Sequence, residues 1–194
     1  MIGKNEDRGL DDCLSSINTF LDEIGFVDTG STDKTVEIAK SHDVKLHHFT
    51  WCDDFAAARN VSIEPAIGDW ILWMDCDDRM PAEHLPLIRK LASPASPEIG
   101  GYLFTCRCPG ADEQDGETMV HHLRMFRRHD TIRFEHRLHE QALPAVRRAG
   151  LVVRFAEVEI IHEGYDWTEA GQILKRERDL RILTLELLDY PNHP

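Results

Sequence analysis

The sequence predicts an α/β fold in which a mostly parallel sheet is flanked by helices. Short apolar runs alternate with stretches of helical periodicity along the first hundred residues, which is the pattern of repeated β-α-β units. Residues 70–74 are apolar at every position, as expected for a strand that is buried on both faces. A length of 194 residues suits one domain with a sizeable core.

The expected elements can be placed in chain order. The first helix has an apolar face made of Leu14, Ile17, Phe20 and Leu21. After it we expect a strand at 23–27, a helix at 36–39, a strand at 44–49, a helix at 55–64 opened by Asp53 and Asp54, the strand at 70–74, and a helix at 85–91 behind Pro81. Strand-like sequence resumes at 101–107, 119–127 and 151–161.

A long final helix is expected at 168–190. One of its faces is lined by Ile173, Leu180, Leu183 and Leu187. The charged residues 175–179 lie between them in the sequence and are predicted to form a solvated face.

Composition limits the possible partners. A formal charge of −13 argues against a nucleic-acid binder, because such proteins neutralise phosphates with basic patches. A phosphate-bearing ligand is still compatible, since a divalent cation can mediate between carboxylates and phosphates. The chain shows no apolar run long enough to span a bilayer and no signal peptide, so we expect a cytoplasmic protein.

The five cysteines have no framework-like spacing and are expected to be reduced thiols. Cys106 and Cys108, with His121 and His122 nearby, also allow a zinc site. Two thiols on one face of a strand are the simpler interpretation, because zinc sites usually space their cysteines more widely.

Acidic residues follow two of the expected strands. Asp28 ends one strand, and Asp75, Asp77 and Asp78 follow another. Ligands of open parallel sheets bind beyond the carboxyl ends of the strands. Close carboxylates repel by about 1 kcal/mol in water and roughly 4 kcal/mol near a protein surface, so we expect a divalent cation with oxygen ligands here. An acidic turn without a metal is the alternative.

Asp28 opens the second loop of interest. Gly30 permits a tight turn from strand to helix, and the hydroxyl of Ser31 can bind a ligand or cap the helix. Taken alone, this stretch is a capping loop more often than a nucleotide site.

Together these motifs resemble family 2 glycosyltransferases, in particular the bacterial branch whose catalytic domains are often followed by tetratricopeptide repeats. The resemblance covers nearly the whole chain. It is carried by Lys4-Asn5-Glu6, residues 28–35 (DTGSTDKT), residues 53–60 (DDFAAARN), residues 68–78 (GDWILWMDCDD), Arg133-Phe134, Leu138-His139-Glu140 and His162-Glu163-Gly164-Tyr165.

The resemblance implies a GT-A fold and inverting transfer of a sugar from a nucleoside diphosphate, commonly UDP. It assigns donor binding to Asp28, Gly30, Ser31, Asp54, Arg59, Asn60, Asp75 and Asp77. It assigns Mn²⁺ or Mg²⁺ to the Asp-x-Asp pair of Asp75 and Asp77, with His162 as a further ligand; a structural role for His162 is equally compatible. The whole chain is then one catalytic domain, with a donor half at about 1–100, an acceptor and metal half at about 101–165, and the final helix.

Glu140 is the expected catalytic base. Inverting transfer needs a group that takes the acceptor's proton, and the metal-binding acids lie on the wrong side of the sugar. Glu140 matches an acid in the family's His-Glu pair, and Glu135 and Glu163 come next. Alternatively, Glu140 pairs with Arg137 or caps the following residues.

Two departures and two rival functions complete the expectations. Gly3 replaces an apolar residue in a first strand that looks cut short, and 191–194 end abruptly after a helix, so we expect a fragment or a misplaced start. His136 stands where similar sequences often carry glycine. The rivals are a nucleotidyltransferase, for which Lys4 is the one candidate triphosphate-binding residue, and a non-catalytic sugar-nucleotide or interaction module.

Overall fold

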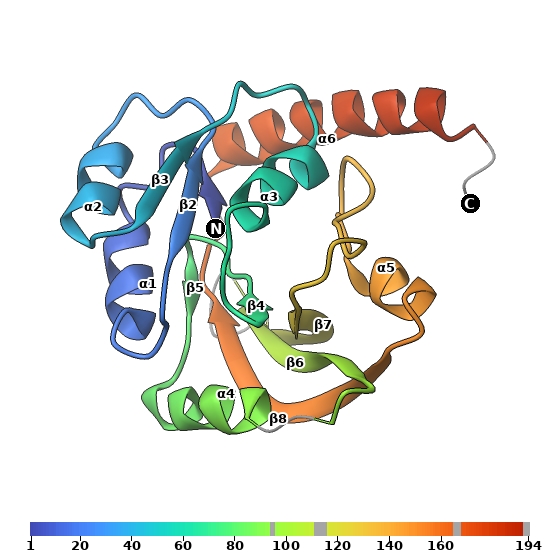
Figure 1. Cartoon of the computed structure of the whole chain (residues 1–194). Helices are drawn as coiled ribbons and strands as arrows, with labels where there is room; N and C mark the ends of the chain where they lie inside the picture. The colour runs from blue at the N-terminus through green and yellow to red at the C-terminus, as the bar shows by residue number, and fades with distance from the viewer. Residues whose placement is uncertain (94–95, 111–115, 165–167, 192–194) are drawn as a thin grey trace.

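The computed structural model describes residues 1–93, 96–110, 116–164 and 168–191. Tyr165 of the last motif and residues 192–194 lie outside the described residues. The fold is α/β, with one parallel sheet, one mixed sheet and flanking helices (Figure 1).

The first sheet is parallel, as the β-α-β pattern predicts. Its strands, in spatial order, are β1 (Ile2–Gly3), β2 (Gly25–Asp28) and β3 (Lys45–His48). Helices α1 (Leu10–Ile17) and α2 (Thr35–Ser41) cover one face, and α3 (Phe55–Ile63) covers the other (Figure 1).

Alternation along β2 produces these two layers. Phe26 packs with Leu10 of α1 and Ala39 of α2, whereas its neighbour Val27 packs with Ala58 of α3. Successive side chains of a strand point to opposite faces, so two adjacent apolar residues bury both sides of the sheet. Helix α1 ends at Ile17, earlier than its apolar periodicity predicts.

The second sheet is mixed. It contains a strand that was not predicted, β5, and its strands β6 and β7 are longer than the predicted ones. Its strands are β4 (Trp70–Leu72), β5 (Asp78–Arg79), β6 (Ile99–Pro109), β7 (Glu117–Arg127) and β8 (Val152–His162). They are arranged as β4-β7-β6-β8-β5, and β6–β8 is the parallel pair among antiparallel ones.

Strand β4 was expected in a parallel sheet, and this expectation was wrong. The apolar run at 70–74 does form a strand, but it is short, lies at the end of the strand order and pairs antiparallel with β7. Burial of the following residues accounts for the rest of the run, since Trp73 and Met74 pack into the core on opposite sides of the sheet.

The remaining helices complete the fold. They are a 3-10 turn η1 (Ala82–His84), α4 (Leu85–Ala92), α5 (Leu143–Arg148) and α6 (Glu169–Asp189). Strand β5 and helix α5 were not expected from the sequence. In Figure 1, α6 runs across the top of the molecule, past α3.

The orientation of α6 differs from the prediction. Ile173, Leu180, Leu183 and Leu187 are all exposed, whereas Ile182 is the residue of this helix that the structure buries completely. Polar residues of α6 instead face the body, as the contacts below show. Within the described residues, every helix is too short or too polar to cross a membrane.

Candidate functional site

A cleft of about 1440 Å³ opens where both sheets end. Its walls combine the N-terminal segment around Glu6, the acidic turn after β4, the paired strands β6 and β7, residues 138–143 and the inward side of α6. Segments far apart in the sequence therefore share one cavity, which is large enough for a ligand with several chemical groups.

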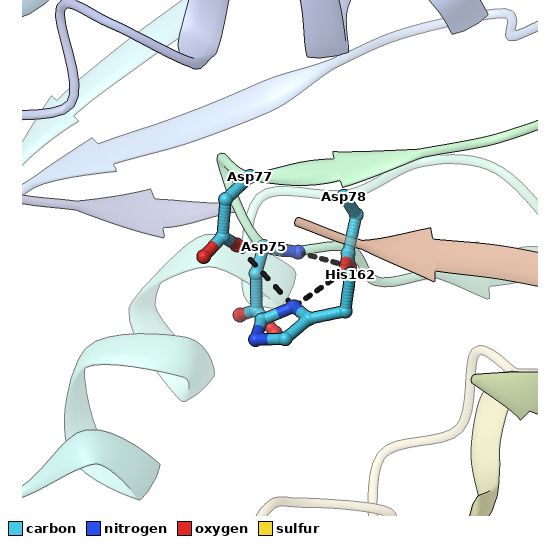
Figure 2. A group of neighbouring side chains, drawn as sticks. All are labelled: Asp75, Asp77, Asp78 and His162. Carbon is cyan, nitrogen blue, oxygen red and sulfur yellow. Dashed lines mark hydrogen bonds and ion pairs between the residues drawn. The ribbon is translucent and has the colours of Figure 1, made fainter. Parts of the chain in front are cut away.

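The acidic turn and the end of β8 form a cluster at the floor of the cleft. Asp75, Asp77, Asp78 and His162 each offer a ligand atom, and these atoms lie within 4.8 Å of one another (Figure 2). Antiparallel pairing of β5 with β8 places Asp78 opposite His162, 84 residues away in the sequence.

Asp78 is fully buried and holds the cluster together. Its Oδ2 accepts hydrogen bonds from the backbone N–H of Asp75 at 2.7 Å and from Arg124 Nη1 at 2.8 Å. Its Oδ1 lies 2.9 Å from Nδ1 of His162 (Figure 2). A carboxylate at Nδ1 orients the imidazole ring and favours Nε2 as the ligand nitrogen.

Asp75 and Asp77 differ in electrostatic environment. Burial raises the pKa of Asp77 to about 6; His162 opposes this shift, and the charges of Asp75 and Asp78 add to it. Burial also disfavours ionised Asp75, but the positive charges of Arg59 and Arg124 hold its pKa well below the usual range. The hydrogen bond to Asp78 raises the pKa of His162.

The residues present fit a hard divalent cation. Asp77 pairs with no arginine or lysine among the described residues. Its Oδ1 lies 3.4 Å from Nδ1 of His162. Oxygen donors with one imidazole suit Mn²⁺ or Mg²⁺. Gly164 leaves the space that Asp77 needs, because a Cβ at that position would overlap the Asp77 carboxylate.

Arg59 joins this cluster to the expected base. Its Nη2 donates to Asp75 Oδ1 at 2.5 Å, and its Nε donates to Glu140 Oε1. Glu140 therefore lies in the cleft, one guanidinium group away from Asp75. Its partner is Arg59, whereas Arg137 pairs with Asp54, the N-cap of α3, and with Asp189 of α6.

The Asp28 loop lies at the edge of the cleft. Asp28 accepts hydrogen bonds from the backbone N–H groups of Gly30 at 3.3 Å and Ser31 at 2.9 Å. Gly30 has φ +107°, which explains why glycine stands there. Burial opposes ionisation, but the hydrogen bonds led by Ser31 lower the pKa of Asp28. Among the described residues of this loop, Thr29 forms part of the cleft wall.

Two predicted donor-binding residues have structural partners instead. Asp54 caps α3 by accepting from the backbone N–H of Ala57 at 2.8 Å. Asn60 clamps the backbone of Phe134, donating to its carbonyl at 3.0 Å and accepting from its N–H at 2.9 Å. Neither side chain belongs to the cleft wall that the described residues form.

The other acidic candidates do not belong to the cleft wall that the described residues form. Glu135 pairs with Arg148 of α5, and Glu163 lies 3.5 Å from Arg79 and is half exposed. His136 has φ +73°, a conformation that favours glycine, and its Nδ1 contacts Glu186 of α6 at 2.7 Å. The glycine typical of similar sequences at this position therefore has a backbone reason.

Sequence reasoning missed Arg124, Trp73 and the structural role of Asp78. Arg124 is 3% exposed within the apolar stretch 123–126, and a lone arginine in such a stretch signals a buried ion pair. The alternative zinc site is not supported: within the described residues, the grouped ligands are the acids and His162, while Cys106 Sγ accepts from Arg124.

Comparison with known proteins identifies relatives of the chain. The sequence profile described as "Glycosyl transferase family 2" matches residues 1–142. A TPR repeat-containing protein of Synechococcus elongatus is 33% identical over 98% of this chain and 48% of its own length. The SPbeta prophage-derived glycosyltransferase SunS of Bacillus subtilis is 30% identical over 98% of this chain and 44% of its own length. The chain thus spans about half the length of these relatives.

A solved structure shares the fold. Glucosyl-3-phosphoglycerate synthase from Mycobacterium tuberculosis, in complex with Mn²⁺, UDP and glucosyl-3-phosphoglycerate, superimposes with a TM-score of 0.59. The match covers 93% of this chain and 77% of that one at 15% sequence identity. At that identity the likeness concerns the fold, and it confirms the GT-A architecture.

Proposed function

Because this chain belongs to glycosyltransferase family 2, we propose that it transfers a sugar, with inversion, from a UDP-sugar to an acceptor of unknown class. The observation that carries the proposal is the cluster of Asp75, Asp77 and His162 at the floor of the cleft. The likeness in fold to a synthase solved with Mn²⁺ and UDP supports the choice of donor and metal.

In this proposal, Asp75, Asp77 and His162 hold Mn²⁺ or Mg²⁺, which neutralises the charge of the departing diphosphate when bound. Asp77 is the strongest candidate, because it has no arginine partner among the described residues, and because burial, with a further contribution from Asp75 and Asp78, raises its pKa, so that a cation would stabilise its ionised form. Asp78 keeps His162 oriented through Nδ1.

The donor is proposed to extend from this cluster toward the Asp28 loop. Parallel strands β1 to β3 end there, and in such sheets the nucleotide binds beyond the strand ends. Asp28 then faces the base, with Gly30 and Ser31 shaping the loop. For Asp54 and Asn60 we propose an indirect part: their contacts hold α3, which carries Arg59.

Glu140 is proposed as the base for the acceptor. As the acceptor oxygen forms a bond to the anomeric carbon, Glu140 takes its proton, and the bond from that carbon to the β-phosphate oxygen breaks. Arg59 occupies Oε1 of Glu140, which leaves Oε2 to take the proton. His139 lines the cleft next to Glu140.

The single-domain organisation is also a proposal. The cleft is lined by the donor half, by β6, β7 and the segment 138–143 of the acceptor half, and by α6, which fits one catalytic unit at 1–194. Tetratricopeptide repeats in a longer parent are suggested by the name of one relative.

A ligand melt tests the proposal. UDP with Mn²⁺ should raise the melting temperature, whereas UDP with EDTA should not, because the diphosphate needs the metal to approach the carboxylates. At a hundred times the dissociation constant, a ligand adds about 2.7 kcal/mol of stability. Equal shifts with Mn²⁺ and with EDTA would refute metal-dependent donor binding.

Turnover decides between an enzyme and a binding module. We expect Mn²⁺-dependent release of UDP from a UDP-sugar, and Glu140→Gln should lower turnover by about 10²–10⁴-fold with UDP affinity retained. Glu163→Gln is the matched control and should stay near the parent. Binding without turnover would favour the non-catalytic module, and turnover of nucleoside triphosphates would favour a nucleotidyltransferase.

A further inference from the structure

We propose that Trp73 is a positioning residue of the site: its indole contacts two guanidinium groups and holds both in place around the Asp75 carboxylate. This inference rests on the proposed function, because Asp75 and Glu140 are the groups whose placement Trp73 would control. Trp73 carries no charge, so it would act on these carboxylates through Arg59 and Arg124.

Two guanidinium groups lie close to the Trp73 ring. The guanidinium carbon of Arg59 lies 4.2 Å from the centre of the Trp73 ring, and that of Arg124 lies 3.9 Å from it. Both arginines are buried, so they have lost most of their hydration. A cation over an indole face is attracted more strongly when it is desolvated, and tryptophan is the best aromatic partner.

The two arginines contact different oxygen atoms of the Asp75 carboxylate. Arg59 donates to Asp75 Oδ1 at 2.5 Å, and Arg124 lies 3.6 Å from Asp75 Oδ2. Each arginine also holds a second carboxylate: Arg59 holds Glu140, and Arg124 holds Asp78 at 2.8 Å. Through Arg59 and Arg124, Trp73 is therefore linked both to the donor-side acids and to the acceptor-side base.

Trp73 is itself fixed by the core. Its Nε1 donates to the carbonyl of Leu123 at 2.6 Å, and its ring meets Phe134 edge-on at 5.7 Å between centroids. Backbone pairing to β7 continues at this residue, since Trp73 N donates to the carbonyl of Arg124 at 3.0 Å. A rigid indole can therefore define where the guanidinium planes lie.

The consequence concerns the distance between Asp75 and Glu140. One guanidinium group spans the two carboxylates, so a change in its tilt moves both. Misplacement of reacting groups by about 1 Å is enough to cost up to 10²-fold in rate. Removing the aromatic face should thus lower turnover more than it weakens donor binding.

Three variants separate this role from simple packing. Trp73→Phe keeps an aromatic face, and Trp73→Leu removes it; both lose the Nε1 hydrogen bond equally. Trp70→Leu is the matched control, because Trp70 lies three residues earlier, at the start of β4, and its ring contacts Arg127 at 4.7 Å, away from the cleft. All three are compared by melting temperature, Mn²⁺ affinity by electron paramagnetic resonance, UDP-glucose hydrolysis, and the NMR shifts of the arginine Hε protons.

We expect Trp73→Leu to lower kcat by about tenfold with a smaller change in KM, and Trp73→Phe to restore most of it. The Arg59 and Arg124 Hε signals, shielded by the indole in the parent, should move in Trp73→Leu and not in Trp70→Leu. Unchanged signals, or kinetics of Trp73→Leu equal to those of Trp70→Leu, would overturn the inference. A parent that hydrolyses no UDP-sugar would refute the proposed function instead, and the Hε shifts and Mn²⁺ affinity would still decide the role of Trp73.

Discussion

The floor of the cleft and the outward face of α6 place charged and apolar side chains in opposite environments. Arg59 and Arg124 are 6% and 3% exposed, whereas Leu180 and Leu187 of α6 are 66% and 60% exposed. Buried arginines are tolerated where carboxylates and an indole replace their lost water, as they do around Asp75. No comparable contact explains the exposure of the leucines among the described residues.

Helix α6 is attached to the body largely through polar contacts. Arg181 pairs with Asp53 at 2.8 Å, Asp189 pairs with Arg137 at 2.7 Å, and Glu186 contacts His136. These pairs are partly exposed, unlike the pair of Arg124 with Asp78. We therefore expect ion pairs of similar length to contribute differently to stability, because solvent screens the exposed pairs and does not screen the buried pair.

Breaking the buried pair should have the largest effect. Arg124→Gln leaves Asp78, which is completely buried, without its arginine partner, and breaking a buried ion pair typically costs about 3–5 kcal/mol. Urea unfolding should show this loss at low and high salt alike. Arg107→Gln on the neighbouring strand removes two solvent-accessible pairs, with Glu117 and Glu159, and serves as the control; an equal loss in both variants would contradict the comparison.

The one buried side chain of α6 should come next. Ile182→Ala should cost about 2–5 kcal/mol if α6 unfolds together with the body. Hydrogen exchange of α6 amides distinguishes global from local unfolding. If α6 opens alone, its amides will exchange faster while those of β6 keep their protection, and the two regions are then separate cooperative units.

The Arg181–Asp53 pair should contribute a smaller, pH-dependent amount. The hydrogen bond from Arg181 lowers the pKa of Asp53. A lowered folded-state pKa means that the pair stabilises the fold above the unfolded value near 3.9, and that this stabilisation is lost as the pH falls through the folded value. Arg181→Gln should therefore lower the urea midpoint at pH 7, with a gap that closes in acid and narrows in 0.5 M salt. Arg176→Gln removes the same charge from the same helix and should show no such gap.

Leu180→Glu should have the smallest effect. An exposed side chain makes few contacts to lose, so the free energy of unfolding should change by no more than about 0.5 kcal/mol. Urea unfolding measures it directly. A loss above 2 kcal/mol would show that the outward face of α6 is covered in solution.

Several parts of the site were open to prediction because they depend on neighbours in the sequence. Asp75 and Asp77 follow an apolar run, Asp54 precedes α3 as its cap, and Gly30 adopts a positive φ in a strand-to-helix turn. Capping, turn conformation and burial of an apolar stretch act over a few residues, so composition and spacing reveal them.

The final helix shows where such reasoning fails. Periodicity identified α6 and its apolar face, but periodicity carries no information about which face meets the body. The partners that orient α6 are Asp53 and Arg137, 128 and 52 residues from their contacts on the helix. Their positions follow from how the rest of the chain folds.

By itself, the sequence determined the α/β class, the parallel first sheet, the acids after β2 and β4, and membership in the family. Tertiary structure alone decided that Arg59 joins Asp75 to Glu140, that Asp78 contacts His162, and that two arginines contact Trp73. The reason is physical: the first set depends on local backbone preferences and apolar patterning. The second depends on desolvated charges brought together from positions as much as 84 residues apart, which exist only once both sheets have formed.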